Sequence, residues 1–175
     1  AIVGGRGDKS GSRTLNRATD TVRQPGSTFK VLAAYAPALD TAGMTLATVQ
    51  DDAPYTYSNG TSLRNYDNSY RGFTTIRYAI TKSINVVTVK TLTDISPQVG
   101  YDYLQNFGFT TLVPEDIVES LSLGGITRGV TNLELTAAYA TIADMGNYIR
   151  PRFYTRILDH SGNVLIDNTA ESHTV

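Results

Sequence analysis

A nearly continuous hydrophobic stretch lies in the first quarter of the chain. Every residue between Phe29 and Leu39 is hydrophobic except Lys30 and Pro37. This pattern predicts a helix over residues 27–41 that is buried on most of its sides. Because proline has no backbone N–H group, Pro37 should kink this helix or end it early.

Three later segments carry helical spacing or helix-boundary signals. We expect helices within residues 74–92, over 97–107 and over 131–146. The second helix has proline at its first position, and the third opens with a Thr-x-x-Glu capping box at Thr131. A glycine follows or closes each of these last two helices, as is common at helix C-termini.

The remaining segments resemble strands or loops. Residues 153–158 and 164–166 are strand-like and flank a turn at 160–163, which predicts a hairpin. Residues 1–3 resemble the end of a strand already in progress. Residues 43–73 are rich in Asp, Asn, Tyr, Gly and Ser, which favours a long irregular excursion on the surface. The expected fold class is α+β, with helices dominating the middle of the chain.

Composition excludes several classes of function. The 175 residues are one domain or a large piece of one, and a net charge of −1 argues against a nucleic-acid partner. No apolar run approaches the roughly 20 residues that a membrane span needs. The chain has no cysteine and only two histidines, His160 and His173, both in polar sequence. We therefore expect no metal site, no cofactor and no His-dependent triad, so acid–base chemistry falls to Lys, Asp, Glu or Tyr.

Ser27 and Lys30 form the first candidate site. Pro25 and Gly26 break the preceding chain, so the predicted helix starts at or just before Ser27, and residues three apart share one helix face. The free N–H groups at the helix start favour negative charge near the serine, and apolar surroundings should lower the pKa of the lysine. A neutral amine beside a hydroxyl is a general base next to a nucleophile. The alternative is a capping serine and a lysine whose amine reaches the surface.

Ser83 and Asn85 form the second candidate site. These two short polar residues interrupt an apolar helical pattern. Because Ser and Asn compete with helix backbone bonds, we expect a tight turn between two helices here. If that turn faces Lys30, Ser83 can relay a proton and Asn85 can bind a substrate amide. The alternative is the polar face of one continuous helix.

Taken together, the motifs resemble the transpeptidase domain of class A penicillin-binding proteins, members of the penicillin-binding serine transpeptidase superfamily. The segments that carry the resemblance are 16–18, 23–30, 83–87, 121–125, 131–140 and 161–165. They cover nearly the whole chain in the family's order, and the sequence around Ser27 is most similar to enzymes of Gram-positive bacteria. The implied fold is β-lactamase/DD-transpeptidase-like.

The resemblance also implies a mechanism. Ser27 would attack the D-alanyl-D-alanine end of a peptidoglycan stem peptide, and Lys30 would take its proton. Ser83 would help to pass a proton to the leaving amine, while Asn85 would hold the substrate amide and Lys30. The implied partners are peptidoglycan stem peptides and β-lactams, at the extracytoplasmic face of the bacterial cell membrane. A membrane anchor is expected in the full-length protein.

One motif of the family is absent. No Lys-Thr-Gly or Lys-Ser-Gly tripeptide follows Asn85, and Lys9-Ser10-Gly11 precedes Ser27 in a polar, loop-like stretch. We expect residues 1–175 to be a partial transpeptidase domain with an incomplete sheet, lacking the third-motif strand and the glycosyltransferase domain. The helix over 27–41 should then expose an apolar face.

Three alternative functions stay open. A class A β-lactamase shares the first two motifs and needs a later glutamate to activate water; Glu115 and Glu119 lie in that stretch. A penicillin-sensing receptor domain would be acylated without turnover. A helical structural domain would carry the motifs by chance. Labelling with a fluorescent penicillin separates the last from the others, and the deacylation rate separates the lactamase.

Overall fold

The computed structural model describes residues 8, 11 and 15–175. The strand predicted at 1–3, as well as Lys9 and Ser10, lie outside these residues. The α-helices are α1 (Ala36–Thr41), α2 (Ile76–Lys82), α3 (Asn85–Ile95), α4 (Pro97–Asn106) and α5 (Asn132–Ala143). Shorter helical segments are the 3-10 helices η1 (Gly26–Thr28), η3 (Pro114–Asp116) and η4 (Glu119–Leu123) and the π-helix η2 (Val31–Tyr35). Within the described part of the chain, no helix is long and apolar enough to cross a membrane.

The predicted central helix is confirmed, but its backbone pattern changes along its length. It runs from Gly26 to Thr41 through η1, η2 and α1. The N–H group of Ala36 bonds the carbonyl of Val31, five residues back, which is the π-helical pattern. Pro37 therefore does not end the helix; it is the second residue of α1, just after the change from the π-helical to the α-helical pattern.

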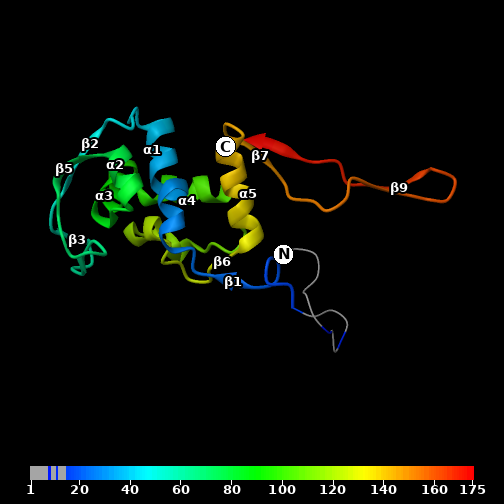
Figure 1. Cartoon of the computed structure of the whole chain (residues 1–175), viewed down its shortest axis with the longest axis horizontal. Helices are drawn as coiled ribbons and strands as arrows, with labels where there is room; N and C mark the ends of the chain where they lie inside the picture. Colours follow the sequence, from blue (N-terminus) through cyan, green and yellow to red (C-terminus); the bar gives the residue numbers. More distant parts are fainter. Residues whose placement is uncertain (1–7, 9–10, 12–14) are drawn as a thin grey trace.

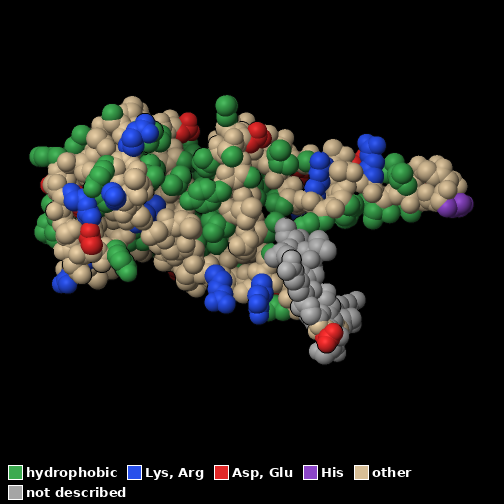
Figure 2. All heavy atoms as spheres, in the orientation of Figure 1, with side chains coloured by type: hydrophobic (Ala, Val, Ile, Leu, Met, Phe, Trp, Pro, Cys, Tyr) green, Lys and Arg blue, Asp and Glu red, His purple; other side chains and the backbone are tan. Residues whose placement is uncertain are grey.

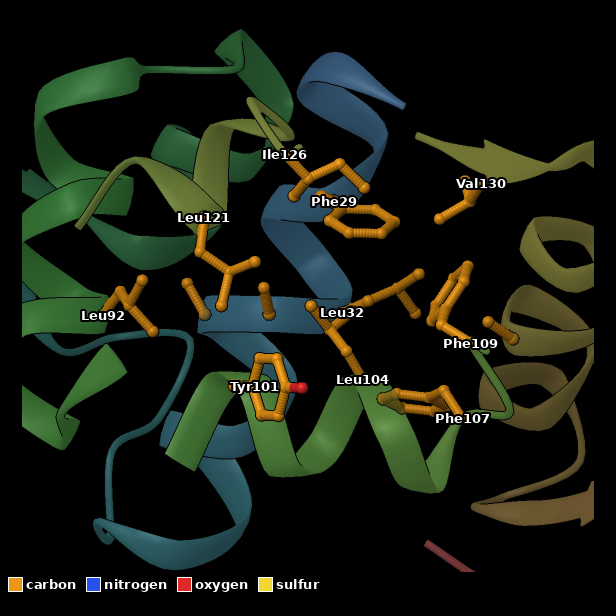
Figure 3. Packing of buried hydrophobic residues seen from close by; sticks show 13 residues of the cluster. Phe29, Leu32, Leu92, Tyr101, Leu104, Phe107, Phe109, Leu121, Ile126 and Val130 are labelled. Carbon is orange, nitrogen blue, oxygen red and sulfur yellow. The ribbon is translucent and has the colours of Figure 1, made fainter. Parts of the chain in front are cut away.

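The central helix is covered, contrary to the prediction that it would expose an apolar face. Phe29, Leu32 and Ala38 are fully buried, and Tyr35 is 1% exposed. The covering elements are α3, α4 and η4. Figure 3 shows the main cluster, in which side chains of the central helix meet those of α4 and the segments that follow it. The exposed large apolar side chains of the described residues lie on other elements, among them β5, α5 and the hairpin near the C-terminal end.

Close packing of α4 on the central helix depends on a glycine. A Cβ atom at Gly100 would lie 2.4 Å from the carbonyl oxygen of Ala33 and 2.6 Å from Leu92 Cδ1. Both distances are shorter than real contacts allow, so only glycine lets α4 approach this far. Helix α4 itself has the predicted Pro97 start, and it ends at Asn106, with Gly108 in the left-handed region at φ +86°.

The helical stretch predicted within 74–92 divides in two. Helix α2 begins at Ile76 rather than Thr74, because Thr74 lies in a strand and Thr75 accepts the Tyr78 N–H at 3.2 Å as the N-cap. Helix α2 ends at Lys82, and α3 begins at Asn85. The predicted turn at 83–85 is therefore confirmed.

Short strands pair across the segment that was predicted to be irregular, and this part of the prediction was wrong. The strands of this segment are β2 (Val49–Asp52), β3 (Tyr55–Thr56), β4 (Ser62–Leu63) and β5 (Gly72–Thr75), and two further short strands outside it are β1 (Val22–Arg23) and β6 (Val130–Thr131). All pairs are antiparallel: β2 with β5, β3 with β4, and β1 with β6. The first two pairs lie at the end of the molecule away from α5 (Figure 1).

The C-terminal part combines confirmed and missed elements. Helix α5 opens with the predicted capping box between Thr131 and Glu134, and ends at Ala143. The predicted hairpin forms from β8 (Arg156–Leu158) and β9 (Val164–Asp167) and projects from the body. Strand β10 (Ser172–Thr174), which the sequence analysis did not predict, pairs with β7 (Asn147–Ile149). The result is a mixed α+β arrangement of helices with small two-stranded sheets.

Candidate active site

Ser27 lies in the first turn of the central helix, on the solvent side. Gly26 takes a left-handed backbone at φ +56°, which turns the chain into η1. The Ser27 side chain is exposed, whereas Phe29 and Lys30, which follow it, are buried. Tyr139 of α5 donates its hydroxyl to the carbonyl of Thr28 at 2.7 Å. The turn that carries Ser27 is therefore held from α5 as well as by its own helix.

Lys30 is a buried amine whose hydrogen bonds all go to the turn between α2 and α3. Its side chain is 4% exposed. The amine donates to the Ser83 carbonyl at 2.5 Å, to Ser83 Oγ at 2.9 Å and to Asn85 Oδ1 at 2.6 Å. An ammonium group has three N–H donors, so these three acceptors satisfy it completely. The predicted gathering of Lys30, Ser83 and Asn85 is thus present as geometry.

The backbone of the turn explains how Ser83 can present two oxygens to one amine. Ser83 adopts the left-handed conformation at φ 53°, as the residue that closes α2. Its carbonyl is therefore turned out of the helix and is free to accept from Lys30. Two residues later, Asn85 is the first residue of α3, and its amide oxygen reaches the same amine.

The surroundings of Lys30 favour its neutral form. Burial lowers the pKa of the Lys30 amine from about 10.5 to about 8. The salt bridges of the described residues do not include Lys30, so neutral oxygens alone stabilise its positive charge. A substantial share of the amine is therefore unprotonated just above neutral pH, as a general base requires.

Ser27 is placed one turn before Lys30 but is not joined to it. We expected the two side chains to face each other; among the described residues, the hydrogen bonds of Lys30 instead go to Ser83 and Asn85. The reason is the count of donors, since three acceptors from one turn occupy the whole ammonium group. Loss of one proton would leave a lone pair and free one of these positions.

Two residues that support this site were not singled out from the sequence. Asn65 binds the start of α3, and Gly124 packs against Gly26. Asn65 lies in a stretch with several similar Asn and Asp residues, so composition could not separate it from its neighbours. Gly124 lies within a segment that carried the family resemblance, and this was its only signal.

The surface carries a small hollow beside the turn and a larger one elsewhere. Among the described residues, no group of three or more His, Cys, Asp or Glu side chains could hold a metal ion. A hollow of about 80 Å³ lies beside the turn and is lined by residues that include Asn65, Lys82 and Ser83. A larger one, of about 440 Å³, lies between β1 and the start of α5 and includes none of the four candidate residues.

Comparison with solved structures identifies the fold. Penicillin-Binding Protein 1A from Haemophilus influenzae aligns with 91% of this chain and 24% of its own, with a TM-score of 0.77 and 28% identity. The D,D-transpeptidase domain of a peptidoglycan glycosyltransferase from Eggerthella lenta aligns with a TM-score of 0.75 over 94% of this chain and 47% of its own. At 18% identity, the second likeness shows the fold alone.

Sequence comparison then gives the family. The family model described as Penicillin binding protein transpeptidase domain matches residues 2–174. The chain belongs to this family. It is 38% identical over 175 residues to Penicillin-binding protein 1F of Bacillus subtilis and 37% identical over 188 residues to Penicillin-binding protein 1A of Clostridium acetobutylicum. All of this chain aligns in both cases, and it spans about a quarter of the length of these relatives, 24% and 23%.

Proposed function

We propose that this chain is the nucleophile-bearing part of a D-alanyl-D-alanine transpeptidase domain that cross-links peptidoglycan and is acylated by β-lactams. The single observation that carries the proposal is the buried Lys30 amine. It lies one helical turn after an exposed serine, has a pKa lowered to about 8, and bonds Ser83 and Asn85. Family membership supports the choice of acyl transfer as the reaction class.

In the proposed acylation, Ser27 Oγ attacks the carbonyl carbon of the penultimate D-alanine. The hydroxyl proton passes to the neutral Lys30 amine while the Oγ–C bond forms. The C–N bond to the terminal D-alanine then breaks, and the leaving nitrogen takes a proton from Lys30 by way of the Ser83 hydroxyl. An ester on Ser27 and free D-alanine result.

In the proposed second half, the amine of a neighbouring stem peptide attacks the ester. It loses a proton to Lys30, forms the new amide bond and releases Ser27, whose oxygen takes the proton back. Asn85 holds Lys30 through its Oδ1 atom, at 2.6 Å. A β-lactam would follow the same first half, with its ring C–N bond as the one that breaks.

The β-lactamase alternative is disfavoured by the glutamates on which it depends. Glu119 accepts hydrogen bonds from the Tyr55 hydroxyl at 2.9 Å and from the Ser58 N–H and hydroxyl at 2.9 and 3.0 Å. Its carboxylate is therefore occupied by Tyr55 and Ser58, in and after β3, and is not available to activate a water beside Ser27. Glu115 lies exposed in η3.

We further propose that residues 1–175 are a partial transpeptidase domain, and that a Lys-Thr-Gly strand elsewhere in the parent protein completes the site. Such a strand would add a cation for the substrate carboxylate and part of an oxyanion hole. Loss of one oxyanion donor alone costs roughly 10²–10³ in rate. The proposed location is the extracytoplasmic face of the bacterial cell membrane, with an anchor outside this segment, since the substrate is cell-wall peptidoglycan.

The experiment is covalent labelling of the parent protein with a fluorescent penicillin, followed by intact mass and peptide mapping. We expect one label on Ser27 and none in a Ser27→Ala variant, whose exposed position leaves the fold intact. Ser161→Ala, in the hairpin turn, is the control and should label as the parent does. Labelling of Ser27→Ala at full stoichiometry would overturn the assignment of the nucleophile.

A further inference from the structure

The first turn of α3 is capped by a side chain from a different part of the chain. Helix N-termini leave backbone N–H groups without an intrahelical partner, and Ile84, at the N-cap position, has no side-chain acceptor. Asn65 Oδ1 accepts instead, from the Asn85 N–H at 3.0 Å and the Val86 N–H at 3.1 Å. Asn65 is 4% exposed and lies between β4 and β5.

The Asn65 amide is itself fixed from behind. Its Nδ2 group donates to Asp52 Oδ1 at 2.7 Å and to the Ser69 carbonyl at 2.9 Å. Asp52 is fully buried at the end of β2, and its second oxygen accepts from the Arg71 N–H at 3.1 Å. Both ends of the Asn65 amide are thus occupied, so the side chain has one orientation in which every donor and acceptor is satisfied.

The residue before Asn65 binds the side chain of Asn85. Asn85 Nδ2 donates to the Arg64 carbonyl at 2.9 Å, while Asn85 Oδ1 accepts from Lys30 at 2.6 Å. An amide with its nitrogen held on one side must present its oxygen on the other. Arg64 and Asn65 therefore hold both the backbone and the side chain of Asn85, on the side away from Lys30.

We propose that Asn65 is a positioning residue of the active site: by capping α3 and fixing Asn85, and with Asp52 behind it, it sets the place of the Lys30 amine. This inference rests on the proposed function for its catalytic meaning. Asn65 acts through Asn85 and takes no proton in the reaction. Its effect reaches Lys30 through the turn that Asn65 holds, because all three acceptors of that amine belong to this turn.

A purely structural cap predicts a different result from a positioning residue. A cap that only stabilises α3 would lower the stability of the chain and leave the titration of Lys30 unchanged in the molecules that stay folded. A positioning residue changes the hydrogen bonds of the buried amine, and hence its pKa, in those same folded molecules. The titration of Lys30 therefore separates the two roles.

The experiment compares Asn65→Ala, Asn65→Ser and Thr131→Ala with the unchanged chain. All three substitutions are neutral in charge. Asn65→Ser keeps one oxygen for the first turn of α3 but is too short to reach Asp52, and so remains informative if Asn65→Ala does not fold. Thr131→Ala is the matched control. It removes the N-cap side chain of α5, which accepts a hydrogen bond from the Glu134 N–H at 3.2 Å. It does not change any hydrogen-bond partner of Lys30.

The chain has four lysines, Lys9, Lys30, Lys82 and Lys90, so ¹³C-labelling of lysine side chains gives few signals to follow by NMR as pH is raised. We expect the Lys30 pKa to move by at least half a unit in both Asn65 variants and to stay in place in Thr131→Ala. In the parent protein, the penicillin acylation rate should fall by about 100-fold in Asn65→Ala, the effect of misplacing a reacting group by about 1 Å. A smaller fall is expected in Asn65→Ser, and none in Thr131→Ala.

The two measurements separate the two proposals. An unmoved Lys30 titration and an unchanged acylation rate in folded Asn65 variants would overturn the positioning role and leave the proposed function standing. A moved titration in a parent protein that penicillin does not label at all would support the positioning of Lys30 and reject the transpeptidase assignment.

Discussion

Gly124 packs directly against the backbone of Gly26, and no side chain fits between them. A Cβ atom at Gly124 would lie 2.3 Å from the Gly26 carbonyl oxygen and 2.4 Å from its nitrogen. Gly124 also takes a left-handed backbone, at φ +70°. The residue before Ser27 therefore rests on the end of η4, and this contact determines where the serine turn lies.

Gly124→Ala should accordingly destabilise the chain and displace Ser27. The left-handed backbone costs alanine about 1–2 kcal/mol, and overpacking against backbone adds about 1–3 kcal/mol. We expect the free energy of unfolding to fall by about 2–5 kcal/mol in denaturant titrations, with slower penicillin labelling of the parent protein. Gly125→Ala is the control, because a Cβ there meets nothing within 4 Å. Equal effects at the two positions would contradict this account.

The lowered pKa of Lys30 predicts that stability rises with pH. Between pH 8 and about 10.5, the unfolded chain keeps a proton on this lysine that the folded chain has lost. Stability increases wherever the unfolded state binds more protons, so raising the pH through this window should stabilise the fold by about 3 kcal/mol.

Unfolding of the unchanged chain and of Lys30→Met, followed across this pH range, measures that gain. The variant should lack it, and the curve of Lys82→Met, an exposed lysine, should parallel that of the unchanged chain. Parallel curves for the unchanged chain and Lys30→Met would mean that Lys30 titrates normally.

Glu134 joins the start of α5 to the segment between α4 and η3. Its carboxylate accepts from the N–H groups and hydroxyls of Thr110 and Thr131, at 2.7–3.0 Å. Burial alone would raise the pKa of Glu134, but hydrogen bonds from Thr110 and Thr131 outweigh it and hold the pKa below its usual range. The carboxylate therefore stabilises the fold above its unfolded pKa, near 4.3, and this contribution is lost as pH falls through the lowered value.

Glu134→Gln should lower the free energy of unfolding at pH 7 by about 1–3 kcal/mol, because some of the four donors lose their acceptor. The deficit relative to the unchanged chain should shrink as the pH falls below 4. Glu115→Gln, at an exposed position, should change little at either pH. A deficit that is independent of pH would show that the charge on Glu134 contributes nothing.

The sequence predicted those features of the fold that depend on residues close together in the chain. The Thr131 capping box, the Pro97 helix start and the turn between α2 and α3 depend on residues a few positions apart, and all were predicted. The burial of the central helix followed from its own composition, although the elements that cover it did not.

The parts that were missed depend on partners distant in the sequence. Strand β2 pairs with β5, which begins 20 residues after β2 ends, and β10 pairs with β7, so neither β2 nor β10 has a pattern of its own that marks it as a strand. The supporting residue Asn65 is one of several asparagines in its segment, and only the fold decides which of them meets α3. Ser83 and Asn85 could be singled out because they interrupt an apolar helical pattern. Asn65 stands in a polar segment, where one more polar residue does not stand out.

The hydrogen bonds of Lys30 have a consequence for how the chain folds. They join residues 53 and 55 positions apart, so a long loop must close before any of them can form. Individual helices form within about a microsecond, whereas contacts between distant segments wait for the chain to assemble. The shifted Lys30 amine should therefore arise late in refolding, after helical signals are complete. A probe of the Lys30 proton would therefore report the fraction of molecules in which α3 has docked on the central helix. Circular dichroism reports helix content and does not distinguish these molecules from partly assembled ones.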